Sequence, residues 1–329
     1  MQEKQKQDQL AEVAARYAVS VTDAVMATIN PADPNDPVAR QYLPSVEELK
    51  TTPREMDDPI GDDAHSPVKG VVHRYPDRVL LKPVHVCAVY CRFCFRREMV
   101  GPGSKMLTPP EMAAAVDYIR QTPAIWEVIL TGGDPFVMSP RRLKMLMDEL
   151  NAIDHVKVIR VHTRVPVADP DRVTPDLVAA LESDKAVYVV LHANHAQELT
   201  DKVKAASLMM VKAGIPLLSQ STLLRGVNDD AAVLENLFRT LTAMRVKPYY
   251  LHHPDMAPGT GHFRLPISTG QALTTALSGK LSGIAQPRYV LDIPGGFGKV
   301  PVGESHITPV DGGHTVTDYQ GQSHFYATE

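Results

Sequence analysis

The sequence predicts an α/β protein in which parallel strands form an open or closed β/α barrel. From about residue 70, short apolar runs alternate with helical patterns, and polar side chains follow many of the apolar runs. Strand–helix alternation is typical of βαβ units with a parallel sheet. Its repetition along the chain favours a barrel, in which chemistry occurs at the carboxyl ends of the strands.

Seven apolar runs are predicted to be strands, and six helical patterns accompany them. The strands are expected at residues 78–84, 127–131, 156–162, 186–192, 215–221, 248–252 and 288–292. The helices are expected at residues 110–121, 140–153, 175–183, 196–213, 231–244 and 269–281. We therefore expect a barrel core at residues 66–285 and a C-terminal segment at residues 286–329.

A helical region, residues 1–65, precedes the barrel. The spacing of apolar residues over 7–17 predicts a helix, and Thr22 is a candidate N-cap of a second one. The stretches 30–37 and 52–63 are rich in Pro and Asp, which favour turns. At the other end of the chain, alternating side chains after residue 305 suggest one or two strands or an arm.

Composition and charge narrow the class of protein. Of the 329 residues, 44% are hydrophobic and 22% charged, which is typical of a globular protein and excludes intrinsic disorder. The net charge of −4 gives no basic excess for a nucleic acid or a membrane surface. The polar start lacks the apolar core of a secretory signal, and no apolar run approaches the roughly 18 residues of a membrane helix. We expect a cytoplasmic protein.

All three cysteines lie in one segment, as Cys87, Cys91 and Cys94. Thiolates at this C-x3-C-x2-C spacing can hold one compact metal centre. A [4Fe–4S] cluster held by three thiolates leaves one iron open to another ligand. The alternatives are a zinc ion with His85 or another histidine as the fourth ligand and three ordinary buried cysteines. Zinc sites usually use two separated pairs of ligands, so the open cluster is the favoured interpretation.

Lys299 follows the glycine-rich sequence Ile293-Pro-Gly-Gly-Phe-Gly. A primary amine on a mobile stem can form an imine with a carbonyl cofactor, and neighbouring glycines would let that cofactor approach. The alternative is an ordinary surface lysine after a turn. A P-loop is excluded, because its pattern would need Gly in place of Ile293 and Ser or Thr in place of Val300.

Several motifs, in this order, resemble the lysine 2,3-aminomutase family of the radical S-adenosylmethionine (SAM) superfamily. The motifs are Arg74-Tyr-Pro-Asp-Arg78, the cysteine segment with Arg96-Arg97, Leu130-Thr-Gly-Gly-Asp134, Gln220-Ser-Thr-Leu-Leu-Arg-Gly-Val-Asn228, Gly259-Thr-Gly-His-Phe-Arg264 and Asp292-Ile-Pro-Gly-Gly-Phe-Gly-Lys299. The similarity extends over residues 66–303. It implies a partial (open) β/α barrel of the radical SAM type, with an N-terminal helical extension and a C-terminal arm.

The resemblance implies an enzyme, an isomerase that moves the 2-amino group of L-lysine to C3 and so makes β-lysine. A reduced [4Fe–4S] cluster would split SAM and generate a 5′-deoxyadenosyl radical. This radical would take a hydrogen from a substrate held as an imine of pyridoxal 5′-phosphate (PLP). An external electron donor is implied as a partner, and the protein would orient and insulate these groups.

The resemblance also implies which residues hold the cofactors. Lys299 would carry PLP, and the forked donors of Arg74 and Arg78 would hold its phosphate. The alternative for these two arginines is a solvated edge or a salt bridge with Asp77. The remaining contacts to SAM and the other cofactors would come from Gly132, Gly133, Asp134, His192 and Gln220.

Three further residues would bind the substrate. Arg96 would pair with its α-carboxylate, and Asp255 and Asp292 would face its side chain. Two carboxylates near one end of a pocket favour an ammonium or guanidinium group. The resemblance therefore favours lysine and allows arginine, whereas the glutamate-using branch would be expected to lose the acidic pair. The alternative roles are a surface arginine for Arg96 and a turn residue for Asp292.

The chain departs from the family pattern in two ways. Larger members carry later cysteines that bind a structural zinc between subunits, and no cysteine follows Cys94. We therefore expect no structural zinc, and a homo-oligomer is left open. The length of the chain is similar to that of a shorter branch of the family, whose members make β-lysine for attachment to elongation factor P. The non-enzymatic alternative is a metal-cluster protein that acts only through interactions, which a colourless, zinc-containing preparation would support.

Overall fold

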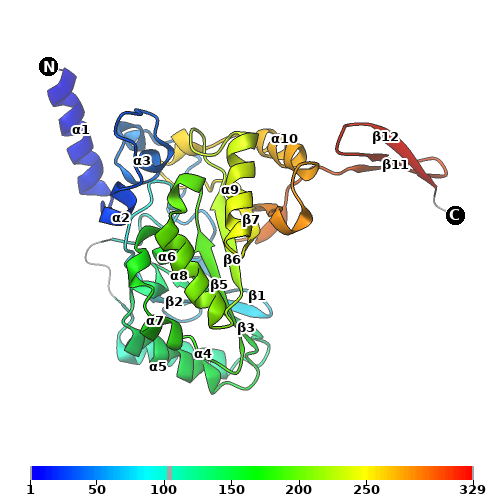
Figure 1. Ribbon diagram of the computed structural model, residues 1–329. Helices are drawn as coiled ribbons and strands as arrows, with labels where there is room; N and C mark the ends of the chain where they lie inside the picture. Colours follow the sequence, from blue (N-terminus) through cyan, green and yellow to red (C-terminus); the bar gives the residue numbers. More distant parts are fainter. Residues whose placement is uncertain (1, 102–105, 328–329) are drawn as a thin grey trace.

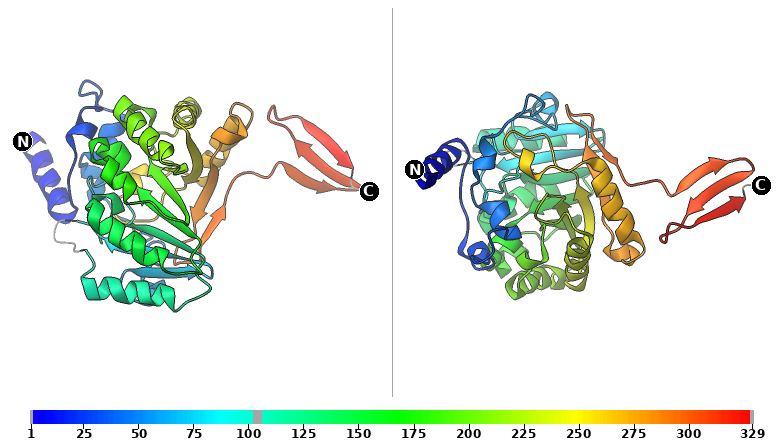
Figure 2. Two further views of the ribbon diagram at one scale, coloured as in Figure 1. Left: turned by 60° about the horizontal axis from the view of Figure 1, so that its bottom comes forward. Right: turned by 90° about the horizontal axis from the view of Figure 1, so that it is seen from above.

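A nine-stranded curved sheet forms the centre of the computed structural model, which describes residues 2–101 and 106–327 (Figures 1 and 2). Each strand neighbours the next one along the chain: β1 Val71–Tyr75, β2 Arg78–Val84, β3 Glu127–Gly132, β4 Val158–Thr163, β5 Ala186–His192, β6 Leu217–Thr222, β7 Val246–His252, β8 Arg288–Asp292 and β9 Lys299–Pro301. Strands β2 to β8 are parallel, and the edge strands β1 and β9 are antiparallel to their neighbours.

The barrel is open, as predicted, because no pairing between β1 and β9 occurs among the described residues. The two edges nevertheless meet at one point, where the backbone N–H of Lys299 donates to the Tyr75 hydroxyl at 2.7 Å. All seven predicted strands are confirmed, three of them with the predicted ends. The two antiparallel edge strands were not predicted.

Helices cover the outer side of the sheet (Figure 2). The predicted helices are confirmed, with ends that differ by a few residues and a shorter helix at 175: α4 Pro109–Arg120, α5 Pro140–Asn151, α7 Pro175–Ala179, α8 Asp201–Lys212, α9 Ala231–Ala243 and α10 Ile267–Ser278. Short helical segments also connect the strands and helices: the α-helix α6 Val165–Ala168 and the 3-10 helices η3 Pro135–Val137, η4 Pro170–Arg172, η5 Ala196–Glu198, η6 Gly261–Phe263 and η7 Gly283–Ala285. No helix among the described residues combines the length and the apolar character that a membrane span requires.

Side-chain caps determine where the outer helices begin. Thr108 and Glu111 form a reciprocal capping box before α4, the Thr200 hydroxyl caps α8, and the Asp230 carboxylate caps α9. Each cap satisfies backbone N–H groups that have no partner within the helix. The strand-to-helix turns are therefore fixed at the carboxyl edge of the sheet.

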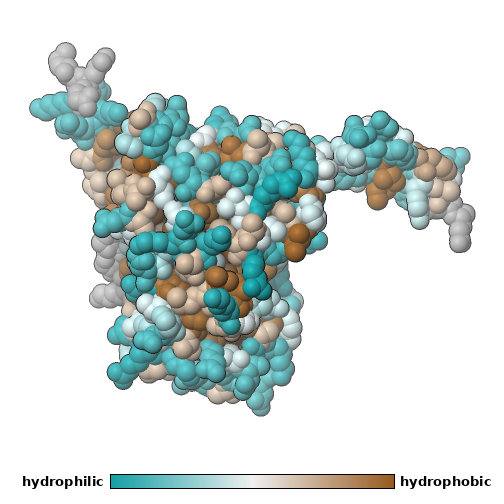
Figure 3. All heavy atoms as spheres, in the orientation of Figure 1, coloured by the Kyte–Doolittle hydropathy of each residue, from teal (hydrophilic) through white to brown (hydrophobic). Residues whose placement is uncertain are grey.

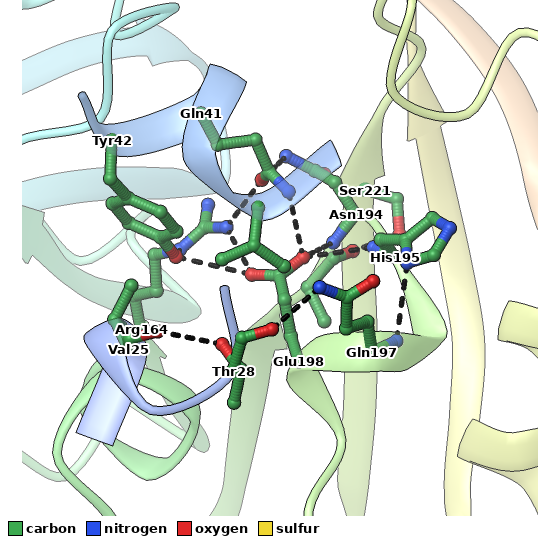
Figure 4. A network of polar contacts seen from close by, with 12 residues as sticks. Val25, Thr28, Gln41, Tyr42, Arg164, Asn194, His195, Gln197, Glu198 and Ser221 are labelled. Atoms are coloured by element: carbon green, nitrogen blue, oxygen red, sulfur yellow. Dashed lines mark hydrogen bonds and ion pairs between the residues drawn. The ribbon is translucent and has the colours of Figure 1, made fainter. Parts of the chain in front are cut away.

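The N-terminal region packs against the barrel through short elements: α1 Gln2–Arg16, α2 Asp23–Met26, α3 Pro37–Tyr42, η1 Val46–Leu49 and η2 Asp63–His65. Thr22 caps α2 as predicted, since its hydroxyl accepts from the Val25 N–H. Gln41 and Tyr42 donate to the buried carboxylate of Glu198, each at 3.1 Å, and Arg164 donates to it at 2.7 Å (Figure 4). These buried polar contacts join the region to the barrel wall.

A three-stranded antiparallel arm follows the barrel: β10 Ile307–Val310, β11 Gly313–Thr317 and β12 Ser323–Ala327. It extends from the body beyond α10, and large apolar side chains of its strands are exposed (Figures 1 and 3). The sequence predicted one or two strands here, so the arm is confirmed and one strand was missed.

Glu48 is fully buried and receives hydrogen bonds from Arg92 at 3.0 Å and from Arg97. Glu48→Gln should lower the free energy of unfolding by about 3–5 kcal/mol, because two buried guanidinium groups lose their counter-charge. Urea unfolding of the metal-free protein measures this change. The neighbouring Glu47 pairs with Lys50 at the surface, so Glu47→Gln should stay within about 0.5 kcal/mol of the unaltered protein. Equal effects of the two substitutions would contradict this account.

Candidate functional site

A cavity of about 630 Å³ lies inside the curved sheet. All the site residues expected from the sequence line it, although they come from widely separated parts of the chain. They are Arg74, Arg78, Cys87, Cys91, Cys94, Arg96, Gly132, Gly133, Asp134, His192, Gln220, Asp255, Asp292 and Lys299. Parallel strands bring their carboxyl ends to one edge, so residues that end successive strands meet there.

The cysteine segment follows β2 and packs against the end of β3. The Gly133 N–H donates to the Val84 carbonyl at 2.7 Å, and the Asp134 N–H donates to the Val86 carbonyl at 3.0 Å. A Cβ atom on Gly133 would overlap the Val86 backbone, and Gly132 has a φ of +107°. Glycine is therefore required at both positions for this close approach.

Burial raises the pKa of all three thiols, to about 11 for Cys91. Among the described residues, no group of three or more His, Cys, Asp or Glu side chains is arranged to chelate a single metal ion. A cubane cluster does not need such convergence, because each thiolate binds a different iron atom. Three thiols on one cavity wall fit that ligand set.

The Asp134 side chain serves the protein's own backbone. Its carboxylate accepts from the N–H groups of Phe136, Arg164 and Val165 at 2.6–3.0 Å and from the Thr163 hydroxyl at 2.7 Å. The side chain is buried, and this burial raises its pKa despite the four hydrogen bonds. A ligand at this turn would therefore be contacted by the backbone rather than by the carboxylate.

Lys299 and Asp292 are directly paired across the antiparallel strands β8 and β9. The Lys299 ammonium donates to Asp292 at 2.6 Å and lies 3.2 Å from Nδ1 of His252. Burial alone would raise the pKa of Asp292, but His252 and Lys299 lower it below its ordinary value. Burial, and then the charge of Asp292, raise the pKa of Asp255 to about 7.

Arg74 and Arg96 supply positive charge in the cavity wall, and Nη1 of Arg74 lies 4.0 Å from Asp292. Both donate to the buried carboxylate of Asp62, Arg74 at 3.1 Å and Arg96 at 2.9 Å. Arg78 pairs with Asp77 at 2.6 Å and stacks on the Tyr75 ring, with its guanidinium carbon 3.8 Å from the ring centroid. The salt bridge that the sequence left as an alternative for Arg78 is thus present, and the residue still lines the cavity.

His192 and Gln220 are register partners on β5 and β6, and their side chains contact each other. His162 on β4 lies 3.4 Å from the same Gln220 amide. Burial lowers the pKa of His162 and His192 well below the ordinary value, so both rings are neutral near pH 7. This part of the wall is polar and uncharged.

The sequence did not predict Asp62 or Glu48, which hold the arginines around the site. Asp62 lies in a stretch that reads only as a turn. One signal was available: Lys82 lies in the middle of the apolar strand 78–84, and a buried lysine needs a carboxylate. In the structure, Lys82 is 4% exposed and its Nζ lies 3.6 Å from Asp62.

Comparisons with known proteins agree with this geometry. The model of the radical SAM superfamily matches residues 81–237. L-lysine 2,3-aminomutase of Clostridium subterminale is 39% identical over 304 residues, which cover 92% of this chain and 73% of that protein. The protein of that name from Acetoanaerobium sticklandii is 40% identical, with 88% and 70% covered. Glutamate 2,3-aminomutase of Clostridioides difficile is 32% identical, with 91% and 71% covered.

Among solved structures, a radical SAM methyltransferase from Sphaerobacter thermophilus aligns with a TM-score of 0.48 and 22% identity, covering 67% of this chain and 68% of that one. The sequence relatives extend further, over most of this chain.

Gly133→Ala should push the cysteine segment away from β3. We expect a loss of about 1–3 kcal/mol in the free energy of unfolding, the usual effect of overpacking, and faster alkylation of the thiols. Urea unfolding and the rate of reaction with a thiol reagent measure the two effects on metal-free protein. Gly283 has nothing within 4 Å of the added Cβ and no positive φ, so Gly283→Ala is the control. Unchanged thiol reactivity in Gly133→Ala would contradict the close packing of the cysteine segment against the end of β3.

Proposed function

Because the chain belongs to the lysine 2,3-aminomutase family of radical SAM enzymes, we propose that it moves the 2-amino group of L-lysine to C3 and yields β-lysine. The observation that supports lysine as the substrate is the contact of 2.6 Å between the Lys299 ammonium and Asp292. Lys299 ends in the same alkylammonium group as free lysine. The contact therefore supports Asp292, with Asp255 beside it in the cavity wall, as the site for a lysine side chain.

The family implies a [4Fe–4S] cluster and SAM, and we propose PLP as the third group. The cavity residues fit it: the Lys299 amine is available for covalent attachment, and the Arg74 and Arg78 guanidinium groups offer forked donors for a phosphate. Arg74 Nε is buried without a hydrogen-bond partner among the described residues, which suits an incoming anion. When bound, the cluster with SAM would supply hydrogen abstraction, and PLP would hold the migrating nitrogen.

The protein's own residues would orient the substrate by its charges. Arg96 would bind the α-carboxylate, and Asp255 with Asp292 would bind the ammonium at the far end. Covalent attachment of PLP would require the Lys299 ammonium to lose its proton and leave Asp292, and the Asp292 carboxylate would then be free for the substrate. The neutral His252, whose pKa burial lowers to about 4, can then accept a hydrogen bond at Nδ1 without adding a positive charge.

Glutamate is the less suitable substrate despite the glutamate 2,3-aminomutase among the relatives. A second carboxylate on the substrate would face Asp255 and Asp292, and like charges in a buried pocket cost several kcal/mol. A guanidinium group could pair with both carboxylates, so arginine is the second candidate.

Anaerobic turnover tests the proposal. The protein is reconstituted with iron and sulfide, supplied with PLP, SAM and dithionite, and offered L-lysine, L-arginine and L-glutamate in parallel. We expect β-lysine from lysine and at most minor product from the other two, measured by mass spectrometry. Lys299→Ala should lose the borohydride-fixed PLP adduct while it retains the iron. An intact cluster and cleaved SAM without any β-amino acid would contradict the proposed reaction.

Activity toward lysine should depend on the charge of Asp255. Since its pKa is about 7, the carboxylate that pairs with the ammonium is present above pH 7 and is lost as the pH falls. We expect kcat/KM to fall about tenfold per pH unit below this pKa and to level off above it. Asp255→Asn should remove this dependence and cost about 2–5 kcal/mol in kcat/KM. SAM cleavage without lysine is the control, and a parallel fall there would refute the assignment.

A further inference from the structure

We propose that Asp62 is a positioning residue, whose buried carboxylate holds Arg74 and Arg96 in the orientation in which they receive the phosphate of PLP and the carboxylate of the substrate. This inference rests on the proposed function and deepens it. It also gives a role to the segment before the barrel, for which the sequence suggested none.

The contacts of Asp62 fix both of its carboxylate oxygens. Oδ1 accepts from Nη2 of Arg74 at 3.1 Å, and Oδ2 accepts from Nε and Nη2 of Arg96 at 3.1 and 2.9 Å. Asp62 is only 1% exposed. Arg96 therefore has one edge of its guanidinium group committed to Asp62, whereas Arg74 has one nitrogen committed to it and another 4.0 Å from Asp292. The remaining donors of the two planar groups are left for other acceptors.

The charges around Asp62 do not balance. Arg74, Arg96 and Lys82 surround the Asp62 carboxylate, and Nη1 of Arg74 also lies 4.0 Å from Asp292. These three cations and two carboxylates carry a surplus of one positive charge. The pKa of Asp62 reflects this: burial would raise it, but the charges of Arg96 and Lys82 hold it below its ordinary value. A phosphate or a carboxylate would neutralise the surplus. Without Asp62, the three cations would repel one another.

The backbone of the same segment also contacts the turn that precedes Lys299. The Asp58 carboxylate accepts from the N–H groups of Asp62 and Asp63 at 2.9 and 2.8 Å, which holds the segment in shape. The Gly295 N–H donates to the Pro59 carbonyl at 3.2 Å. Gly61 lies so close to Gly296 that a Cβ atom would come within 2.7 Å of its Cα. These contacts fix the position of Asp62 relative to the turn that leads into β9 and Lys299.

A comparison with Glu48 separates positioning from stability. Glu48 also holds two arginines, Arg92 and Arg97, but neither of them is among the residues that line the cavity, whereas Arg74 and Arg96 both are. A buried ion pair is weak evidence for a stabilising role. The cavity-facing partners of Asp62 therefore indicate that its charge serves the ligands.

The experiment compares Asp62→Asn with Glu48→Gln as a variant of reduced stability and with the exposed neighbour Asp63→Asn. Three quantities are measured: the dissociation constant of PLP by absorbance titration, KM and kcat for lysine, and the rate of SAM cleavage without lysine. We expect Asp62→Asn to raise the PLP dissociation constant and the lysine KM each by about tenfold, equivalent to about 1.4 kcal/mol. SAM cleavage in Asp62→Asn should stay within about twofold of the wild-type rate. Asp63→Asn should leave both constants unchanged, and Glu48→Gln should leave the PLP dissociation constant unchanged because Glu48 does not contact Arg74.

Two results would overturn the inference while the proposed function stands: wild-type constants in Asp62→Asn, or an equal rise of the PLP dissociation constant in Glu48→Gln. A wild-type protein that binds PLP but makes no β-amino acid would refute the proposed function, and a weaker PLP affinity in Asp62→Asn would then still support the Arg74 part of the inference. If Asp62→Asn does not fold, Asp62→Glu decides. Because both oxygens are fixed, an added methylene group must displace at least one arginine, so unchanged constants in Asp62→Glu would overturn the inference.

Discussion

The structure depends on buried carboxylates that tie the N-terminal region to arginines of the barrel. Three arginines follow closely in the cysteine segment: Glu48 holds Arg92 and Arg97, and Asp62 holds Arg96. A segment that bends to present three thiols cannot form a regular helix or strand, so its shape must be imposed by outside contacts. The N-terminal region supplies these contacts. It therefore supports one wall of the site and is not a separate extension.

The strands and helices of the barrel could be predicted because each buries an apolar run or an apolar face of sufficient length. The edge strands could not. β1 contains the polar residues His73 and Arg74, and β9 is only three residues long. Neither segment therefore has a hydrophobic pattern that distinguishes it from a loop. Their strand character comes from pairing with β2 and β8, which is a tertiary effect. The consequence for the site is direct, since pairing of β9 with β8 brings Lys299 opposite Asp292.

The residues of the site could be predicted as a set, from motif order, and the structure brings them to one cavity. Their partners could not be predicted. Whether Asp134 faces a ligand or the backbone depends on where β4 ends, because Thr163 at its end and Arg164 after it donate to the Asp134 carboxylate. Whether Arg96 lies at the surface or in the wall depends on a carboxylate 34 residues earlier. A turn sequence rich in aspartate gives no indication of which aspartate becomes buried, because burial is decided by packing.

The distribution of charge across the cavity limits the orientation of any amino acid within it. Arg74, Arg96 and Lys82 surround Asp62, whereas Asp255 follows β7 and Asp292 ends β8. The two groups of charges adjoin where Arg74 lies 4.0 Å from Asp292. A molecule with a carboxylate at one end and an ammonium at the other is stabilised in one orientation and opposed in the reverse one, since each reversed end would meet its own sign in a medium of low dielectric constant. Under the proposed function, these charges would orient the substrate before any covalent step, because they act on its two ends and not on the reacting carbon.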